Sequence, residues 1–592
     1  MHAVGDILQA GLNMAALLPR GGAALPLSTL ILLPALGALG LGLLRNLAPN
    51  GVRGLTLAVT LAVFFASLAL PLHFDGHSAQ MQFVEDHAWV PSLHIHFSLG
   101  LDGISLWLVV LTTFIVPAAV LGSWNLIQER VKEFHLALLV MEAAMIGVFC
   151  ATDLMLFYTF FEITLIPMML IVGIWGGRER VRATMKFVLY TLFGSLLMLV
   201  GIIFLYVRTD TFNIAELTRL VALNHGPHGA DLFTPKEYTF LFMAFALAFA
   251  IKVPIVPLHT WLPWAYVEAP TPGSVILSAV LFNMGLYGFM RVAIPFFPTV
   301  AQVFSPVFVF CGVAGVIYGS LMAMAQEDIK KLIAYSLVAH LGICILGLFA
   351  FNRLGWSGAL FLMLAHGVSS GAMFILVGML YERTSTRELA AYGGLARVMP
   401  GFATIFMIVL LSLIGLPLTN GFVAEITVFL GVFGGVGRVV ALLGMTGAIL
   451  GAAYMLTMYL RVFYGRVTQP QNNRLTDLSL RETAVLVPFV ALIFLMGLAP
   501  TLFFAPMEAS IDRSLTDYQY GLRHEAPLTE GVAPTVPERP AAASTAGRPS
   551  RATPSRAPLA LIPPIPPIQP IQPIQPAQPI PSTLSALSGS VK

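Results

Sequence analysis

The feature that most constrains this chain is a series of apolar runs, each close to the length of about 20 residues at which a helix crosses a bilayer. They dominate a 592-residue sequence that is 57% hydrophobic and only 10% charged, far from the composition of a soluble domain. The runs predict an all-α polytopic membrane protein with about 14 transmembrane helices. The expected spans are near 27–44, 54–73, 102–124, 132–151, 153–175, 184–207, 238–258, 273–297, 303–325, 330–350, 355–380, 402–433, 438–463 and 483–504.

Two of these runs contain proline and glycine where a continuous helix is not expected. Run 238–258 leads into KVPIVP, and run 402–433 is interrupted by IGLPLTNGF. Freed backbone groups at membrane depth need protein or water as partners, and matching breaks in the two halves of a transporter mark its ion path. The breaks predict two inverted five-helix repeats, at 132–297 and 303–463.

The other predicted regions flank these repeats. They are an N-terminal extension at 1–26, peripheral transmembrane helices at 27–131, a loop and the last transmembrane helix at 464–504, and a polar, Pro-rich disordered tail at 505–592. The tail segment IPPIPPIQPIQPIQPAQPIP, at 562–581, repeats every three residues, the period of a polyproline II helix. This tail is either a semi-rigid spacer or a docking strip for a partner.

Lys and Arg are distributed unevenly among the predicted loops. They are frequent in loops such as 176–183 and 326–331, whereas the loop at 73–97 has neither. By the positive-inside rule, the first set faces the cytoplasm. With an even number of spans, both termini are then expected on the outer side.

Ionisable residues inside the apolar runs are the candidate functional groups, because such residues are costly in hydrocarbon. Lys252 and Glu162 have opposite charges on different helices, and we interpret them as a switch in which their separation releases a proton from the lysine. The alternative for Lys252 is that its side chain snorkels to the membrane surface, and for Glu162 it is a structural role. Further candidates are Glu425, His340 and His366, with Glu142 as an auxiliary group; the histidines can also be packing residues.

No redox or nucleotide-binding motif accompanies these charges. The three cysteines, Cys150, Cys311 and Cys344, are scattered among the spans, and the sequence has neither CxxC nor a P-loop. We therefore expect no cofactor in this chain and an energy source in a partner or an ion gradient.

Three long strings resemble one known family. GIWGGRERVRATMKFVLYTLFGSLLMLVG, PLHTWLPWAYVEAPTPGSVILSAVLFNMGLYGFMR and AQEDIKKLIAYSLVAHLG closely resemble the M subunit, or chain 4, of bacterial NADH:quinone oxidoreductase, respiratory complex I. The resemblance covers about 80–504. It implies 14 helices, inverted five-helix repeats, and one proton-pumping unit driven by quinone chemistry in other subunits of that enzyme.

The resemblance also implies roles and surroundings. Glu162 and Lys252 map onto the switch pair, His259, His340 and His366 onto a polar axis, and Glu425 onto an exit-side carboxylate. FMN, iron–sulfur clusters and quinone are expected in partner subunits. The expected partners are other membrane subunits of complex I, especially neighbouring antiporter-like subunits, and the lipid bilayer, with no nucleic acid. The expected location is the bacterial inner membrane, with both termini periplasmic.

The chain departs from the family pattern at two sites. After WLP the family usually has Asp-Ala-His, whereas this chain has Trp264, Ala265 and Tyr266; the family string LLKxGxYG usually carries a lysine where this chain has Asn283. Asparagine cannot titrate, so we expect Asn283 and Tyr287 to hold a relay water, with His340 as the nearest titratable group. The alternatives are a subunit of a related cation/proton antiporter, a membrane hydrogenase or a CO2-hydrating uptake complex, or a non-pumping structural paralogue.

Overall fold

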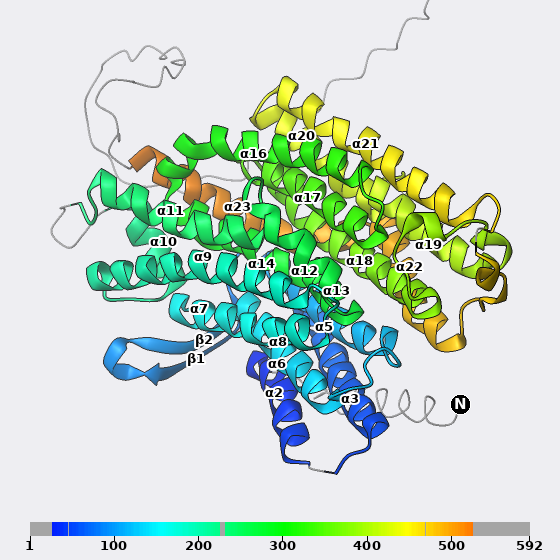
Figure 1. Ribbon diagram of the computed structural model, residues 1–592. Coiled ribbons are helices and arrows are strands. Elements are labelled where there is room, and N and C mark those ends of the chain that lie inside the picture. Colours follow the sequence, from blue (N-terminus) through cyan, green and yellow to red (C-terminus); the bar gives the residue numbers. More distant parts are fainter. Residues whose placement is uncertain (1–25, 45, 225–230, 468, 525–592) are drawn as a thin grey trace, which may run out of the picture. The chain divides into compact units, whose positions relative to one another are not determined.

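Helices make up most of the protein. The computed structural model describes residues 26–44, 46–224, 231–467 and 469–524 (Figure 1). Within these residues, 10 helical segments are long and apolar enough to cross a membrane. They are Pro49–His73 (α3, Pro49–Ser67, and α4, Ala69–His73), Val131–Cys150 (α6), Leu154–Trp175 (α7 and α8), Arg180–Thr209 (α9), Thr271–Phe296 (α13 to α15), Pro298–Met324 (α16), Ile329–Leu348 (α17), Arg353–Thr384 (α18), Arg438–Phe463 (α21) and Leu480–Leu498 (α22). The chain is therefore a polytopic helical membrane protein.

Shorter helices complete the predicted set. Four are apolar: Leu27–Leu43 (α2), Leu106–Gly122 (α5), Pro400–Ile414 (α19) and Asn420–Gly435 (α20). The run predicted at 238–258 begins as α11, Pro235–Lys252, and α10, Ile214–Leu223, precedes it. Short 3-10 turns occupy Pro91–Leu93, Leu389–Ala391, Leu395–Arg397 and Pro470–Arg474. Every predicted span thus contains a helix, while the number of membrane crossings and the inverted relation of the two halves remain predictions.

Both predicted helix breaks are present. α11 ends at Lys252, and the chain continues through a 3-10 turn, Leu258–Trp261, into α12, Leu262–Glu268. Pro254 and Pro257 lie in the intervening turn, where each lacks the N–H that a continuous helix would use. Between α19 and α20, Gly415 ends the first helix with a φ of 81°, a conformation that glycine adopts at little cost.

A third break, which we did not predict, follows Glu162. α7, Leu154–Ile163, and α8, Leu165–Trp175, are separated at Thr164. Pro167 has no N–H to bond the carbonyl of Ile163, which weakens the helix at this point. Glu162 therefore lies next to irregular backbone, as Lys252 does.

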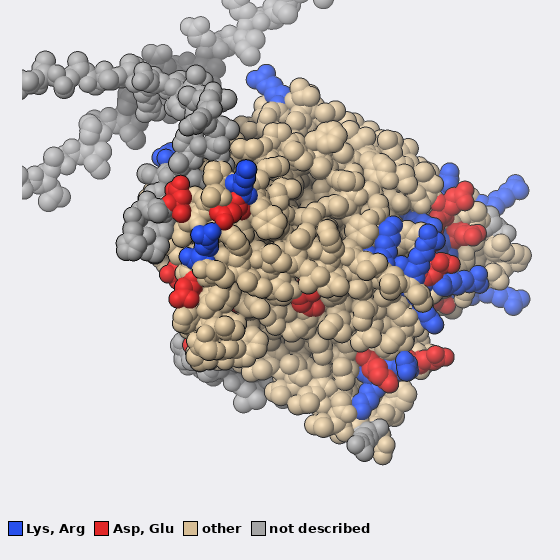
Figure 2. Space-filling model, turned by 60° about the vertical axis from the view of Figure 1, so that its left-hand side comes forward, with Lys and Arg blue, Asp and Glu red and all other residues tan. Residues whose placement is uncertain are grey.

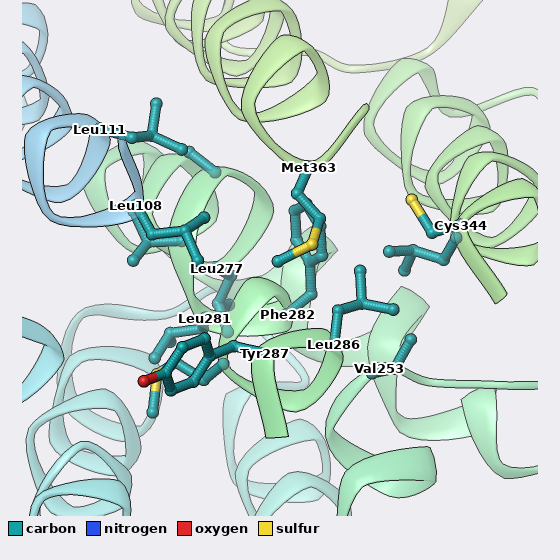
Figure 3. Packing of buried hydrophobic residues seen from close by; sticks show 14 of the residues in the cluster. Leu108, Leu111, Val253, Leu277, Leu281, Phe282, Leu286, Tyr287, Cys344 and Met363 are labelled. Carbon is teal, nitrogen blue, oxygen red and sulfur yellow. The ribbon is translucent and has the colours of Figure 1, made fainter. Parts of the chain in front are cut away.

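The helix that carries Asn283 is also irregular. It comprises α13, Thr271–Ile276, a π-helical turn at Leu277–Leu281, α14, Phe282–Gly288, a second π-helical turn at Phe289–Ala293, and α15, Ile294–Phe296. Gly285 lets α14 approach α11, because a Cβ there would lie 2.7 Å from the Val253 side chain. Figure 3 shows the packing around Phe282, Leu286 and Val253 that results.

The predicted loop at 73–97 contains a feature that an all-α prediction does not include. Strands β1, Gln82–Val90, and β2, Ile95–Leu101, form an antiparallel hairpin. Leu99 and Leu101 on β2 are buried, whereas β1 exposes Val84 and Trp89 and packs on the core with Phe83 and Val90. The fold is thus helical with one short two-stranded sheet.

The prediction of a disordered tail from residue 505 is wrong for its first part. Residues Thr501–His524 form one helix, α23. Its apolar side chains recur at helical spacing and are buried against the membrane helices; they are Phe503, Met507, Ile511, Leu515 and Tyr518. The rest of the predicted tail, with its proline repeat, and nearly all of the predicted N-terminal extension lie outside the described residues.

α18 is the centre of the packed helices. Every residue from Gly355 to Leu380 on this helix is buried, whereas α9 and α21 each bury only a minority of their apolar window. Figure 2 shows a broad band that lacks Lys and Arg, interrupted by one acidic spot, between two ends where charged side chains gather. The band is the surface expected against lipid or apolar partners.

Candidate ion-transfer site

The predicted site residues are carried by seven different elements in the interior. Six of them are buried, and Glu162 is half-buried. The set is Glu162 on α7, Lys252 at the end of α11, His259 in the following 3-10 turn, Asn283 on α14, His340 on α17, His366 on α18 and Glu425 on α20. Four of the elements end or begin at a helix break, so irregular backbone and ionisable side chains occur together.

The structure brings three of these residues together in the second half. The imidazole rings of His340 and His366 stack with centroids 4.9 Å apart, and His340 Nε2 lies 3.5 Å from Glu425 Oε1. A Cβ at Gly415 would lie 3.0 Å from Glu425 Oε2, so the glycine that ends α19 also makes room for this carboxylate. His366, His340 and Glu425 therefore form one contiguous row of titratable groups.

Two backbone carbonyl oxygens contact the ring of His340. Nδ1 lies 2.8 Å from the carbonyl oxygen of Ser336, and Nε2 lies 2.9 Å from that of Leu413. Carbonyl oxygens only accept hydrogen bonds, so both ring nitrogens are satisfied only when both carry a proton. The two contacts fix the orientation of the ring, with Nε2 directed toward Leu413 and Glu425.

Two small cavities adjoin this row. One of about 10 Å³ lies among His340, Glu425 and Tyr454, and another of about 10 Å³ lies among His340, His366 and Ser412. A volume of about 10 to 15 Å³ on this measure accommodates one water. Each cavity has the polar partners that such a water requires.

Three polar residues beside the row were not predicted from sequence. Ser369 and Ser412 hydroxyls lie 2.6 Å apart, Ser412 donates to Asn420 Oδ1, and Asn420 Nδ2 donates to Ser369 Oγ at 3.3 Å. The bonds form a closed ring in which each member donates to the next. The only signal in the sequence was the TNGF string at the start of α20, because the two serines come from distant helices.

In the first half, Lys252 is enclosed by the broken α7–α8 segment. Its Nζ donates to Thr164 Oγ1 at 3.4 Å and lies 4.5 Å from the centre of the Phe161 ring. Lys252 is only 4% exposed, so its ammonium does not snorkel to the surface. Among the described residues, no Glu162 oxygen lies within 4.0 Å of Lys252, and the two predicted partners are near one another but not in contact.

Asn283 links the two halves through a hydrogen bond of its side chain to α18. Its Nδ2 donates to Ala279 O at 2.9 Å and to Met363 O on α18 at 3.3 Å, while its buried Oδ1 has no partner. The Tyr287 hydroxyl donates instead to Phe149 O at 3.3 Å and points away from Met363 (Figure 3). Asn283 therefore faces α18, the helix of His366, and Tyr287 faces α6; the predicted relay water stays a prediction.

The remaining candidates have open hydrogen-bonding capacity. Among the residues that the structure describes, neither carboxyl oxygen of fully buried Glu142 has a hydrogen-bond partner, and His259 Nδ1 has none. The His259 ring meets Tyr318 edge-on, with centroids 5.2 Å apart. Buried polar atoms normally have a partner, so these atoms are candidates for bonding to water.

Trp264 and Tyr266, the two departures from the family pattern after WLP, both make aromatic contacts. The Trp264 ring lies beneath the guanidinium of Arg182 on α9, 4.6 Å from the ring centre. Tyr266 is buried beside Phe374, with ring centroids 5.7 Å apart. Aromatic packing therefore occupies the positions where the family usually has an acid and a histidine.

Comparison with known proteins identifies the group to which this arrangement belongs. Residues 151–451 match a family described as NADH:quinone oxidoreductase/Mrp antiporter, TM. NADH-quinone oxidoreductase subunit M of Rhodobacter capsulatus is 46% identical over 82% of this chain and 94% of its own length, and NADH-ubiquinone oxidoreductase chain 4 of Arabidopsis thaliana is 42% identical over 84% and 98%. A chain of respiratory complex I from Thermus thermophilus with bound NADH aligns with a TM-score of 0.74 at 31% identity, over 83% of this chain and 99% of that chain. The predicted resemblance is confirmed, and the chain belongs to the subunit M family of NADH-quinone oxidoreductase.

Proposed function

We propose that this chain is the proton-translocating membrane subunit of an NADH-quinone oxidoreductase, in which quinone reduction in partner subunits drives protons along its buried ionisable residues. The observation that carries this proposal is the contiguous row of His366, His340 and Glu425, with water-sized cavities at both of its contacts. A row of titratable groups with water between them can pass a proton in steps. A structural role alone requires neither the row nor the cavities.

Lys252 and Glu162 are the proposed switch of the first half. The lysine is held by one hydroxyl and an aromatic ring, so its charge is only partly compensated when the carboxylate is out of contact. Movement of α7 about the break at Thr164 would bring Glu162 closer and favour proton uptake by Lys252. The opposite movement would favour proton release toward Asn283 and α18.

The architecture proposed with this function is that of two inverted five-helix repeats among 14 spans. The support is that the two predicted breaks fall at the fourth helix of each set, α11–α12 in the first and α19–α20 in the second. Glu425 is then the exit-side carboxylate of the second repeat. His259 belongs to the polar axis at the helix break of the first repeat, and both termini of the chain lie on the periplasmic side.

Neighbouring antiporter-like membrane subunits are the proposed partners. Glu162 is half-buried in an apolar span, and Ile166 on the next turn is 59% exposed. A carboxyl that is partly exposed to hydrocarbon is costly, so another protein surface is a better cover for it than lipid. We place FMN, iron–sulfur clusters and quinone in other partner subunits and assign no redox centre to this chain.

The test uses the purified complex in proteoliposomes, with NADH oxidation and proton uptake recorded together. Lys252→Ala and Glu162→Gln should assemble but lose proton translocation, because each removes one member of the switch. Lys132→Ala is the control, since Lys132 bonds the carbonyls of Gly42 and Leu44 in an exposed position. Near-normal proton translocation in either switch variant would refute the assignment.

A further inference from the structure

A ring of three buried polar side chains lies beside the titratable row. Its members are Ser369 on α18, Ser412 on α19 and Asn420 on α20, and each is at most 2% exposed. We call them the serine–asparagine ring. Polar groups are costly to bury unless they are hydrogen-bonded, so the bonds inside the ring decide what it can offer to its surroundings.

Two backbone groups fix the orientation of the Asn420 amide. Its Nδ2 donates to the carbonyl oxygen of Ala365 at 3.1 Å, and its Oδ1 accepts from the backbone N–H of Gly421 at 3.0 Å. A carbonyl oxygen only accepts and an N–H only donates, so these contacts determine which end of the amide is oxygen. A Cβ on Gly421 would collide with the carbonyl oxygen of Ser412, so this glycine also lets α20 begin close to Ser412. Asn420 Oδ1 therefore faces Ser412 as an acceptor.

The positions of the two hydroxyl protons follow from this orientation. Ser412 Oγ lies 2.5 Å from Asn420 Oδ1, a contact that needs a proton, and of the two atoms only Ser412 Oγ has one. Ser369 then supplies the proton between the two serine oxygens, which are 2.6 Å apart, because its contact with Oδ1 is longer at 3.4 Å. Asn420 Nδ2 closes the ring by donating to Ser369 Oγ at 3.3 Å. Both hydroxyl protons are thus used inside the ring, and toward any further group the serine oxygens can only accept.

The ring borders one of the two small cavities of the site. This cavity of about 10 Å³ has a polar lining of His340, His366, Ser369, Ser412 and Glu425. Its volume accommodates a single water. His366 and Ser369 are three residues apart on α18 and so lie on one side of that helix. A water in the cavity therefore has the two serines, a histidine of the row and the carboxyl group of the row as neighbours.

The two histidines are not arranged to exchange a proton directly. Their rings stack with centroids 4.9 Å apart, and an N–H bond lies in the plane of its own ring, so neither ring directs a proton at the other. Both nitrogens of His340 already contact carbonyl oxygens, those of Ser336 and Leu413. In the part of the chain that the structure describes, buried His366 Nε2 has no hydrogen-bond partner. It is the ring nitrogen that remains for a water.

We propose that the serine–asparagine ring holds and orients the water that carries a proton from His366 to Glu425; this rests on the proposed function. Because the serine oxygens can only accept, the water donates one of its protons to the ring. Its second proton then points to the Glu425 carboxylate, and its oxygen accepts from the Nε2–H of His366. The three members of the ring are positioning residues, since none of them gains or loses a proton.

This arrangement prepares a transfer in one direction. Charged His366 gives its Nε2 proton to the water as the water passes its second proton to Glu425. The products are a neutral imidazole, a neutral carboxylic acid and an intact water. The water then turns about its bond to the ring, so that the proton received from His366 faces Glu425. Glu425 releases its proton on the exit side, and His366 is charged again from the first half.

The test compares neighbouring buried serines that differ in whether they belong to the ring. Ser412→Ala and Ser369→Ala each remove one ring oxygen, and we expect the rate of proton translocation in proteoliposomes to fall about fivefold, the effect of losing one hydrogen bond to the water. Ser370→Ala is the matched control, because Ser370 is also buried on α18 but donates to the carbonyl oxygen of Ser278 at 2.7 Å. Equal rates in the three variants would overturn the proposal.

The solvent isotope effect separates positioning of the water from a general loss of packing. When the water is not held, proton transfer from His366 limits turnover, so the ratio of the rates in H2O and D2O should rise in Ser412→Ala and keep its parental value in Ser370→Ala. Ser412→Cys is the second variant where the alanine variant does not assemble, because a thiol fills similar space but is a weak acceptor. It should show the same rise. A parental ratio in the Ser412 variants would contradict the proposed role.

Failure of this proposal can be told apart from failure of the proposed function. If Lys252→Ala stops pumping while the ring variants behave like Ser370→Ala, the proposed function stands and the ring does not position the water. If Lys252→Ala pumps normally, the proposed function itself is refuted, and the role of the ring with it. Loss of pumping in Lys252→Ala, together with slower pumping and a raised isotope ratio in the ring variants alone, supports both.

Discussion

Replacing Glu425 by Asp or by Gln separates the two properties of its carboxyl group, position and titration. In the parent, Glu425 Oε1 lies 3.5 Å from His340 Nε2. Aspartate is shorter by one carbon–carbon bond of about 1.5 Å, so the separation grows to about 5 Å. When both groups are charged, and with an effective dielectric constant of about 20, the attraction between them falls from about 4.7 to about 3.3 kcal/mol.

This difference of about 1.4 kcal/mol corresponds to about a tenfold change in an equilibrium between protonation states. We therefore expect Glu425→Asp to retain proton translocation at about a tenth of the parent rate, with a water in the enlarged cavity bridging the gap. Glutamine keeps the size of the side chain but cannot titrate, so Glu425→Gln should lose translocation. We thus expect the Asp variant to be more active than the Gln variant. Side-chain size alone predicts the opposite order, because Gln has the size of Glu.

The assay records proton uptake and NADH oxidation simultaneously in proteoliposomes, so that the proton yield per NADH is measured rather than the rate alone. Glu508→Gln is the control, because this carboxylate pairs with Arg353 in a half-exposed position on α23. Equal proton yields in Glu425→Asp and Glu425→Gln would show that the carboxyl does not carry protons. A fully active Gln variant would refute the reasoning outright.

Two further variants test the other parts of the structure. Asn283→Leu keeps the approximate size but removes the bond to Met363 O and the unpartnered oxygen, and we expect a large loss of proton translocation with assembly retained; unchanged pumping would contradict a hydrated link at this position. Ile511→Asp buries a carboxylate beneath α23 and should destabilise the assembled complex by about 3 kcal/mol or more, measured by thermal unfolding, whereas exposed Gln519→Asp should not. Deletion from about 530 onward should leave the purified complex intact. If the truncated chain no longer assembles into the complex, the Pro-rich segment is a docking element.

The helix breaks at Lys252 and Glu425 could be predicted because their cause is local. Proline and glycine act within a few residues of their own positions, so KVPIVP and IGLPLTNGF predict irregular backbone at those points. The same reasoning applied to Pro167 would have predicted the break at Thr164. A single proline in an apolar run is weaker evidence of a break, because Pro117 and Pro306 lie inside continuous helices.

The contacts between distant helices could not be predicted. Ser369, Ser412 and Asn420 form a ring only because α18, α19 and α20 pack together, and serine in an apolar span has no distinctive spacing. The Arg291 guanidinium contacts Asp102, which lies 189 residues away in the chain. The amphipathic spacing of α23 was present in the sequence, but the composition of the region beyond it favoured a prediction of disorder.

The breaks and the ionisable residues have one physical cause in common. A broken helix in an apolar interior leaves carbonyl oxygens without N–H partners, and these must be satisfied by side chains or water. At the end of α19, the Leu413 carbonyl oxygen is satisfied by the His340 ring, and at the end of α7 the Phe161 carbonyl accepts from Thr164, which in turn accepts from Lys252.

Each of these side chains is therefore held in place by a carbonyl oxygen that, in a continuous helix, would accept a hydrogen bond from a backbone N–H. A proton donor bound to a carbonyl can exchange that bond for one to water at little cost, because both are neutral acceptors of similar strength. A break thus stabilises a buried His or Lys without fixing it in a strong ion pair. A group bound this loosely can lose and regain its proton during a cycle. A group in a tight ion pair, such as Glu482 with Arg383, cannot readily do so.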